Sequence, residues 1–314
     1  MNSMQEKISL RDKNWFQTGG DAQYFCEPTT VQELESILSF AKINALPIHV
    51  LGAGANTLVN ENGVQGIVVK PAFNVFEVIE KGEKEIFVRV GAGISVSSLI
   101  QRSFEQGAYG LEEFGAIPGS VGGSVYNNLH YFEHSFSDFV VGAQVFEKAT
   151  GTIIEVDSEW FAFGYDYSTL HAKKHIVISV TFKLHAGDPV AIAYARGRLV
   201  EIIRHRLKRY PHSHTCGCFF RNFHENEVEL EVNNKKMIYV GYYFDQLGLK
   251  GTLRIGDAMV SAQHANMIIN CGNATTDDIL AVARTMQEKV FAAYGIMPQP
   301  ECELLGFAEY PLLK

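Results

Sequence analysis

Apolar and polar residues recur along the chain with two different periods, and each period predicts one kind of element. Residues 31–42 have the three-to-four-residue spacing of an amphipathic helix, after a possible cap at Thr29-Thr30. The same spacing predicts helices over 94–106 and 190–208, and a capped helix over 275–294 that Gly295 ends. Alternating or continuous apolar runs between turn residues predict strands within 47–51, 66–70, 75–80, 86–90, 139–156 and 175–184.

Helices and strands are mixed throughout the chain, which predicts an α+β fold. The 314 residues suffice for two or three domains with a substantial core. We expect two α+β subdomains, residues 1–72 and 73–187, each built around a glycine-rich loop. The texture changes after Ala186-Gly-Asp-Pro189, so we expect an α/β domain over 188–314.

Composition and charge are those of an ordinary soluble globular enzyme. The chain is 46% hydrophobic and 20% charged, and its net charge of −8 offers no global attraction for nucleic acid or an anionic membrane. The start, residues 1–7, has no apolar signal region, and no apolar run is long enough to span a membrane. Five cysteines, an odd number and mostly far apart, argue against a disulfide framework and favour the reducing cytoplasm.

Two glycine-rich loops are the strongest candidate ligand-binding motifs. Gly115-Ala-Ile-Pro-Gly-Ser-Val-Gly-Gly-Ser124 and Gly52-Ala-Gly-Ala-Asn-Thr57 could each lay backbone N–H groups against a phosphate. Two such loops suggest one diphosphate cofactor, a dinucleotide. Either loop alone can equally be a tight connection, and neither has the fingerprint of a Rossmann fold or a P-loop.

The segment 212–222 concentrates reactive side chains. In an extended strand His212, His214, Cys216 and Cys218 would share one face, which permits a metal site. The spacing is unusual for zinc and no second ligand pair is present, so we expect no metal. The alternatives are small buried thiols or a thiol that acts as a proton donor.

Two further charged clusters allow a simple and a functional interpretation. Glu301 and Glu303 would share a face of a strand in the C-terminal tail, where most glutamates are only exposed and a few are catalytic. The arginines of the predicted helix 190–208 form either a solvated basic face or part of a site for an anionic ligand.

An ordered series of motifs resembles a known family. The series consists of Asn14-Trp-Phe-Gln-Thr-Gly-Gly20, Leu51-Gly-Ala-Gly-Ala-Asn56, Gly115–Gly123, Gly217-Cys-Phe-Phe-Arg-Asn222, Gly248-Leu-Lys-Gly251, Val260-Ser-Ala-Gln-His-Ala-Asn266 and Pro300-Glu301. In this order they resemble the UDP-N-acetylenolpyruvoylglucosamine reductases, in the shorter class of that family, over about residues 13–306. These flavoenzymes act in early peptidoglycan synthesis.

The resemblance implies an FAD-binding fold of the vanillyl-alcohol-oxidase type, a substrate-binding domain, and a C-terminal tail that returns to the active site. It implies reduction of UDP-N-acetylglucosamine enolpyruvate through FAD, with NADPH as reductant, in a cytoplasmic protein that we expect to be a monomer. The two loops would line the FAD diphosphate, which implicates Gly52, Ala53, Gly54, Ala55, Asn56, Thr57, Gly115, Ile117, Pro118, Gly119, Ser120, Gly122 and Gly123.

The family's catalytic positions also map onto this chain. Cys218 aligns with the serine that protonates the substrate carbon next to the one that receives hydride. Glu301 aligns with a glutamate that stabilises developing charge, and Asp166 aligns with an arginine that balances the substrate carboxylate. Asn222, Arg221 and Tyr165 fall on the substrate side, Asn222 at a diphosphate-binding position.

Three departures from the family pattern lie on this substrate side. A thiol at Cys218 can still donate a proton, but Asp166 inverts a charge. The family's Met-Asn-Ala-Gly-Ala-Tyr-Gly is replaced by Asn127-Asn-Leu-His-Tyr-Phe-Glu133. Three alternatives follow: another cation, such as Arg209 or Arg221, takes the substrate carboxylate, or Asp166 points away, or the substrate differs. The alternative function is a flavin-binding relative that has lost or changed the reaction.

Overall fold

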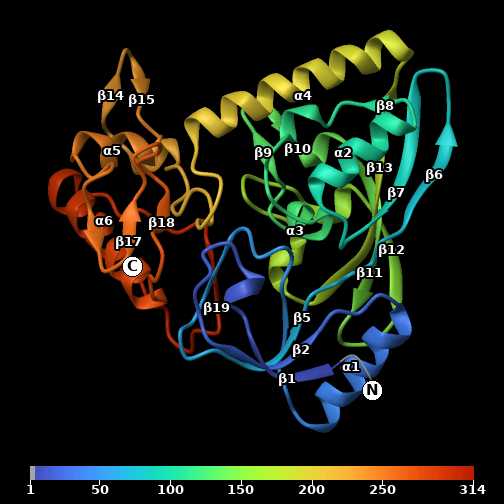
Figure 1. Ribbon diagram of the computed structural model, residues 1–314, viewed down its shortest axis with the longest axis horizontal. Helices are drawn as coiled ribbons and strands as arrows, with labels where there is room; N and C mark the ends of the chain where they lie inside the picture. Colours follow the sequence, from blue (N-terminus) through green and yellow to red (C-terminus); the bar gives the residue numbers. More distant parts are fainter. Residues whose placement is uncertain (1–3) are drawn as a thin grey trace. The chain divides into compact units, whose positions relative to one another are not determined.

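The computed structural model describes residues 4–314. The prediction for residues 1–7 therefore falls partly on Met1–Ser3, which lie outside the described residues. Figure 1 draws the chain with its helices and strands labelled. The helices are α1 (Val31–Ile43), α2 (Val96–Glu105), α3 (Val121–Tyr126), α4 (Pro189–Arg209), α5 (Val240–Gln246) and α6 (Thr276–Tyr294). The strands are β1 (Met4–Ser9), β2 (Asp21–Cys26), β3 (Ile48–Val50), β4 (Thr57–Val59), β5 (Val64–Val69), β6 (Phe76–Lys81), β7 (Glu85–Gly91), β8 (Ala108–Tyr109), β9 (His130–Tyr131), β10 (His134–Ser135), β11 (Val140–Glu147), β12 (Ile153–Asp157), β13 (His175–Ala186), β14 (Glu231–Val232), β15 (Lys235–Lys236), β16 (Arg254–Ile255), β17 (Ala258–Val260), β18 (Ile268–Asn270) and β19 (Glu303–Leu305).

The chain forms two compact units, and each contains segments that are far apart in sequence. Among the described residues, unit 1 consists of 4–6, Tyr24–Ala53 and Gly66–Arg206, and unit 2 of Lys7–Gln23, Gly54–Gln65 and Leu207–Lys314. The finer division at residues 72 and 187 stays a prediction.

An antiparallel sheet organises the larger part of unit 1. Its strands follow the order β12-β11-β13-β7-β6, and β8 pairs with β13. The twelve-residue β13 lies at the centre, with its residues 176–180 buried, which explains its nearly continuous apolar run. The strands predicted within 75–80 and 86–90 are β6 and β7, which pair as an antiparallel hairpin, and α3 packs against β13 and β7.

A second sheet, in the order β1-β2-β5-β3, carries α1. Thr30 caps α1, because its side chain accepts a hydrogen bond from the N–H of Glu33 while Glu33 reaches back to the cap. The buried face of α1 packs with Ile67 and Val69 of β5 in one apolar cluster. The helix therefore begins and faces the sheet as its sequence pattern predicts.

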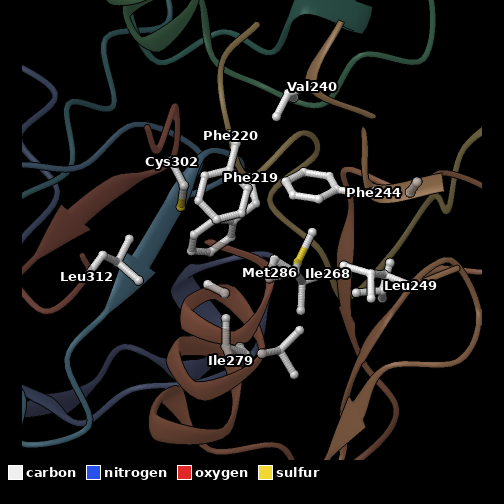
Figure 2. Close-up of a cluster of buried hydrophobic side chains, with 14 of the residues drawn as sticks. Phe219, Phe220, Val240, Phe244, Leu249, Ile268, Ile279, Met286, Cys302 and Leu312 are labelled. Atoms are coloured by element: carbon white, nitrogen blue, oxygen red, sulfur yellow. The ribbon is translucent and has the colours of Figure 1, made fainter. Parts of the chain in front are cut away.

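The core of unit 2 is built around α6. Thr275 caps this helix, and Gly295 ends it in the left-handed conformation with a φ of 70°, where a side chain would be strained. Figure 2 shows Ile279 and Met286 of α6 beneath the rings of Phe219, Phe220 and Phe244. This packing holds the segment around Phe219 from one side, and that segment carries the candidate catalytic thiol.

Candidate functional site

The two glycine-rich loops meet inside unit 1. A Cβ atom added to Gly52 would lie 3.0 Å from Ser120 Oγ and 3.5 Å from the Cα of Gly123. Ser120 caps α3 by accepting a hydrogen bond from the N–H of Gly123, at 3.3 Å. Only a residue without a side chain fits at Gly52 without displacing the second loop. The structure thus brings together two motifs that are separated by more than fifty residues in sequence.

Both loops leave backbone donors available. Within residues 4–314, the N–H groups of Gly52, Ala53, Gly119 and Ser120 donate to no protein acceptor. A backbone N–H group that has no acceptor in the protein donates its hydrogen bond to water or to a ligand instead. Neighbouring N–H groups of this kind form a cradle suited to phosphate oxygens.

Other glycines of the second loop have packing roles. A Cβ atom at Gly115 would collide with the Leu199 side chain of α4, and one at Gly122 would lie 3.0 Å from the Cβ of Ala92. Ile117 is held by a hydrogen bond from its N–H to the carbonyl of Phe114, at 3.1 Å. Their place in the motif therefore has a structural cause besides ligand binding.

The remainder of the first loop belongs to unit 2, in which residues 54–57 follow the unit boundary. Gly54, with a φ of 67°, lies against the backbone of Lys13 and Asn14, and its carbonyl accepts a hydrogen bond from the N–H of Trp15 at 3.0 Å. Asn56 Nδ2 donates to the carbonyl of Glu301 at 3.1 Å. The loop is thereby tied to the tail that carries the candidate glutamate.

Cys218 and Glu301 lie on neighbouring segments of unit 2. The N–H of Glu301 donates to the carbonyl of Phe219 at 2.9 Å, and Phe220 forms a bridge with Pro300. Cys218 forms a bridge with Met267 on its other side. Backbone pairing thus places the two segments that carry Cys218 and Glu301 side by side.

The expectation that residues 212–218 present one face is wrong. His214 and Gly217 have left-handed φ angles of 58° and 84°, which interrupt the alternation of an extended strand. Cys216 is buried, whereas Cys218 is only partly buried. Burial, and then a hydrogen bond with Cys302, raise the pKa of the Cys216 thiol well above its usual value, so this thiol stays protonated and belongs to the core.

Arg221 is committed to an ion pair. Its guanidinium donates to Glu227 at 2.8 and 2.7 Å, and this hydrogen bonding is the main cause that lowers the pKa of Glu227 to about 2. Asn222 is oriented in turn, because its Oδ1 accepts a hydrogen bond from the N–H of Val240 at 3.2 Å. A substrate carboxylate would have to compete with Glu227 for Arg221.

The arginines of α4 mostly have structural partners. Arg198 pairs with Glu113 at 2.5 Å, and Arg204 pairs with Glu201 at 2.7 Å. Arg196 lies over the ring of Phe104, and Arg206 lies over that of Tyr131. These contacts favour the simple interpretation of the basic helix, a solvated basic face.

Within the part of the chain that the structure describes, no helix is both long and apolar enough to cross a membrane.

Asp166 and Tyr165 form a tight turn in unit 1. The N–H of Gly164 donates to the carbonyl of Tyr167 at 3.0 Å, and Asp166 has a φ of 52°. Asp166 Oδ1 lies 3.4 Å from Nδ1 of His130, whose ring also contacts Tyr165. No role for His130 was predicted from the sequence. The available signal was that, by the resemblance, this residue replaces a glycine of the family motif.

Comparison with known proteins covers almost the whole chain. Residues 22–157 match the model of an FAD binding domain, and residues 209–305 match that of the UDP-N-acetylenolpyruvoylglucosamine reductase C-terminal domain. A UDP-N-acetylenolpyruvoylglucosamine reductase from Protochlamydia amoebophila is 35% identical, over 98% of this chain and 95% of that protein. One from Prochlorococcus marinus is 30% identical over 98% and 100%.

A solved structure agrees. The crystal structure of UDP-N-acetylenolpyruvylglucosamine reductase from Thermus caldophilus superposes with a TM-score of 0.77 at 30% identity, covering 96% of this chain and 99% of that one. The predicted α+β, FAD-binding fold is confirmed. The chain belongs to the UDP-N-acetylenolpyruvoylglucosamine reductase family.

Proposed function

We propose that this protein reduces UDP-N-acetylglucosamine enolpyruvate to UDP-N-acetylmuramate, with FAD as cofactor and NADPH as reductant, for peptidoglycan precursor synthesis. The observation that carries the proposal is the near full-length similarity to reductases of this name, 35% identical over 98% of the chain. The juxtaposed glycine loops and the paired Cys218 and Glu301 segments support it independently.

The loops of unit 1 fit the FAD diphosphate. Gly52, Ala53, Gly119 and Ser120 present backbone N–H groups, and a side chain at Gly52 would press into Ser120. Residues 54–57 and the rest of the second loop, Gly115–Gly123, complete the cofactor-binding set that we propose. Bound FAD supplies the hydride chemistry that connects NADPH with the enol ether.

Cys218 holds the proton that the substrate carbon receives. A thiol has a reference pKa of about 8.5, so it is largely protonated at neutral pH and can act as a general acid. Glu301, whose N–H donates to the carbonyl of Phe219, stabilises the charge that develops on the carboxylate side of the substrate. Asn222, Arg221 and Tyr165 complete the substrate-binding set, and Arg221 contributes there while it stays paired with Glu227.

Reduction of the flavin and turnover of the substrate test this assignment separately. We expect a yellow protein that NADPH bleaches and that the enolpyruvyl substrate reoxidises. Cys218→Ala should bleach normally but lose at least about a hundredfold in turnover, the order of a general acid's contribution. Cys218→Ser, with a hydroxyl donor, should retain part of the activity.

Cys271→Ala is the matched control, because Cys271 is an exposed cysteine of the same unit. Normal steady-state turnover in Cys218→Ala would overturn the role of this thiol. A flavin that NADPH bleaches but the substrate never reoxidises would instead favour a relative that has lost or changed the reaction.

The cellular setting is part of the same proposal. Within residues 4–314 none of the five cysteines forms a disulfide, as in proteins of a reducing compartment, and we place the enzyme in the cytoplasm. We propose that it acts as a monomer, which its elution volume and light scattering would test.

A further inference from the structure

Two departures from the family sequence contact each other in unit 1. By the resemblance of the motifs, Asp166 takes the place of an arginine and His130 that of a glycine. His130 Nδ1 lies 3.4 Å from Asp166 Oδ1, and its ring centroid lies 4.8 Å from that of Tyr165. Glycine has no side chain that could make this contact. The two replacements therefore form one paired change.

The backbone around the pair is strained and braced. Asp166, Asn128 and Phe132 have φ angles of 52°, 48° and 51°, in the left-handed region where residues other than glycine are strained. The buried Asn128 offsets this strain, because its Nδ2 donates to the carbonyl of Gly164 at 3.0 Å while its Oδ1 accepts from the N–H of Ser137. Ser168 Oγ also donates to the carbonyl of Tyr126 at 2.7 Å. The turn is thus fastened to the end of α3 at two points.

Strain of this kind persists where the position of a side chain matters. The braces fix the turn that carries Asp166, and His130 begins β9, which pairs with β10. The side chains of His130 and Asp166 are 29% and 15% exposed, so the pair is largely shielded while part of the imidazole stays accessible. This arrangement suits a residue that meets a ligand.

The chemistry of the pair differs from that of either residue alone. Two carboxylates in contact repel each other, and more strongly near a protein surface than in bulk water. A carboxylate that accepts a hydrogen bond from the Nδ1–H of a histidine orients the ring and leaves Nε2 for another partner. In the protonated imidazole both nitrogens donate, so the pair carries no net charge and still offers an N–H group.

We propose that His130, oriented by Asp166, donates a hydrogen bond to the carboxylate of the enolpyruvyl substrate. Asp166 is then a positioning residue that acts through His130. This inference rests on the proposed function. It accounts for a carboxylate at a place where an anionic substrate would otherwise be repelled, without requiring Arg221 to leave Glu227.

The test separates substrate recognition from flavin reduction. KM and kcat for the enolpyruvyl substrate, and the rate of bleaching by NADPH, are measured in the flavin-loaded protein. His130→Gln and Asp166→Asn should each raise KM at least tenfold, with the bleaching rate within twofold of the unmodified protein. His130→Arg keeps a cationic donor and should keep KM within about threefold. His134→Gln, an exposed histidine of the neighbouring β10, is the matched control.

A double variant provides the stricter test. His130→Gly with Asp166→Arg restores the family residues at both positions and should have a KM close to that of the unmodified protein, whereas each single change is impaired. Flavin absorbance and thermal unfolding establish that every variant is folded. If His130→Gln does not hold flavin, Asp166→Asn and the double variant decide.

A KM unchanged in His130→Gln, or in Asp166→Asn where the former does not fold, overturns the role of the pair. The same holds if kcat falls while KM stays constant. Failure of the proposed function has a different signature, because the unmodified protein would then not reoxidise its reduced flavin with this substrate at all.

Discussion

At the scale of single residues, His264 shows how burial sets a charge state. Its Nδ1 accepts a hydrogen bond from the N–H of Asn266 at 3.3 Å, and its ring lies 5.2 Å from that of Tyr210. Burial, and then the charges of Arg209 and Lys250, lower the pKa of this histidine to about 4. The folded protein thus holds His264 neutral at a pH where an unfolded chain would protonate it.

The free energy of unfolding should therefore decrease as the pH is lowered. Between about pH 6.5 and pH 4 the unfolded state binds a proton that the folded state does not, so the free energy of unfolding decreases as pH is lowered, by roughly 3 kcal/mol at most. Urea unfolding at pH 7 and pH 5 measures the loss. His264→Gln should show a smaller loss, and an equal loss in both proteins would contradict this account.

At the scale of elements, helices with caps could be predicted from the sequence and the unusual backbone could not. Thr30 and Thr275 mark the starts of α1 and α6, where hydroxyl caps are expected. The sequence contains no comparable signal for the left-handed conformations of Asp166 and Phe132, which tertiary contacts impose. For the same reason the one-face arrangement of residues 212–218 was wrong, because His214 turns the chain.

The candidate site divides along the same line. The glycine loops could be predicted, since loops that cradle phosphate need glycine wherever they are found. Pairing of Glu301 with Phe219, and of His130 with Asp166, depends on segments far apart in sequence that only the fold brings together. The order of the motifs located the segments of Phe219 and Glu301 through the family resemblance. It could not indicate the contact between His130 and Asp166, because this chain departs from the family motifs at both positions.

The close contact between the two glycine-rich loops can be tested by substitution of Gly52. In Gly52→Ala the added Cβ meets Ser120 Oγ at 3.0 Å, so the loops must move apart by a few tenths of an ångström. We expect FAD affinity to fall roughly tenfold, about 1.4 kcal/mol. Gly197→Ala is the control, because Gly197 lies in α4 with no atom within 4 Å of an added Cβ. Flavin titration of the apoproteins measures both, and similar dissociation constants would refute the proposed cradle.

At the scale of the whole molecule, cofactor binding and folding should be linked. A ligand that binds only the folded state stabilises it by about 2.7 kcal/mol when its concentration is a hundred times its dissociation constant. We expect the Tm of the apoprotein to rise steadily with added FAD, and Gly52→Ala to need more FAD for the same rise. Differential scanning fluorimetry without added dye follows both curves. A Tm that does not respond to FAD would contradict binding to the folded chain.

The composition of unit 2 has a consequence for how the protein is made. Phe16 and Leu58, both fully buried, belong to a core whose other members lie between residues 216 and 312. β4 is likewise synthesised long before β19, the strand with which it pairs in parallel. During synthesis at roughly 5–20 residues per second, these early segments emerge many seconds before their partners. A ribosome stalled near residue 206 would display them uncovered, so the nascent chain is an obvious client for chaperones at that stage and unit 1 is the part able to fold first.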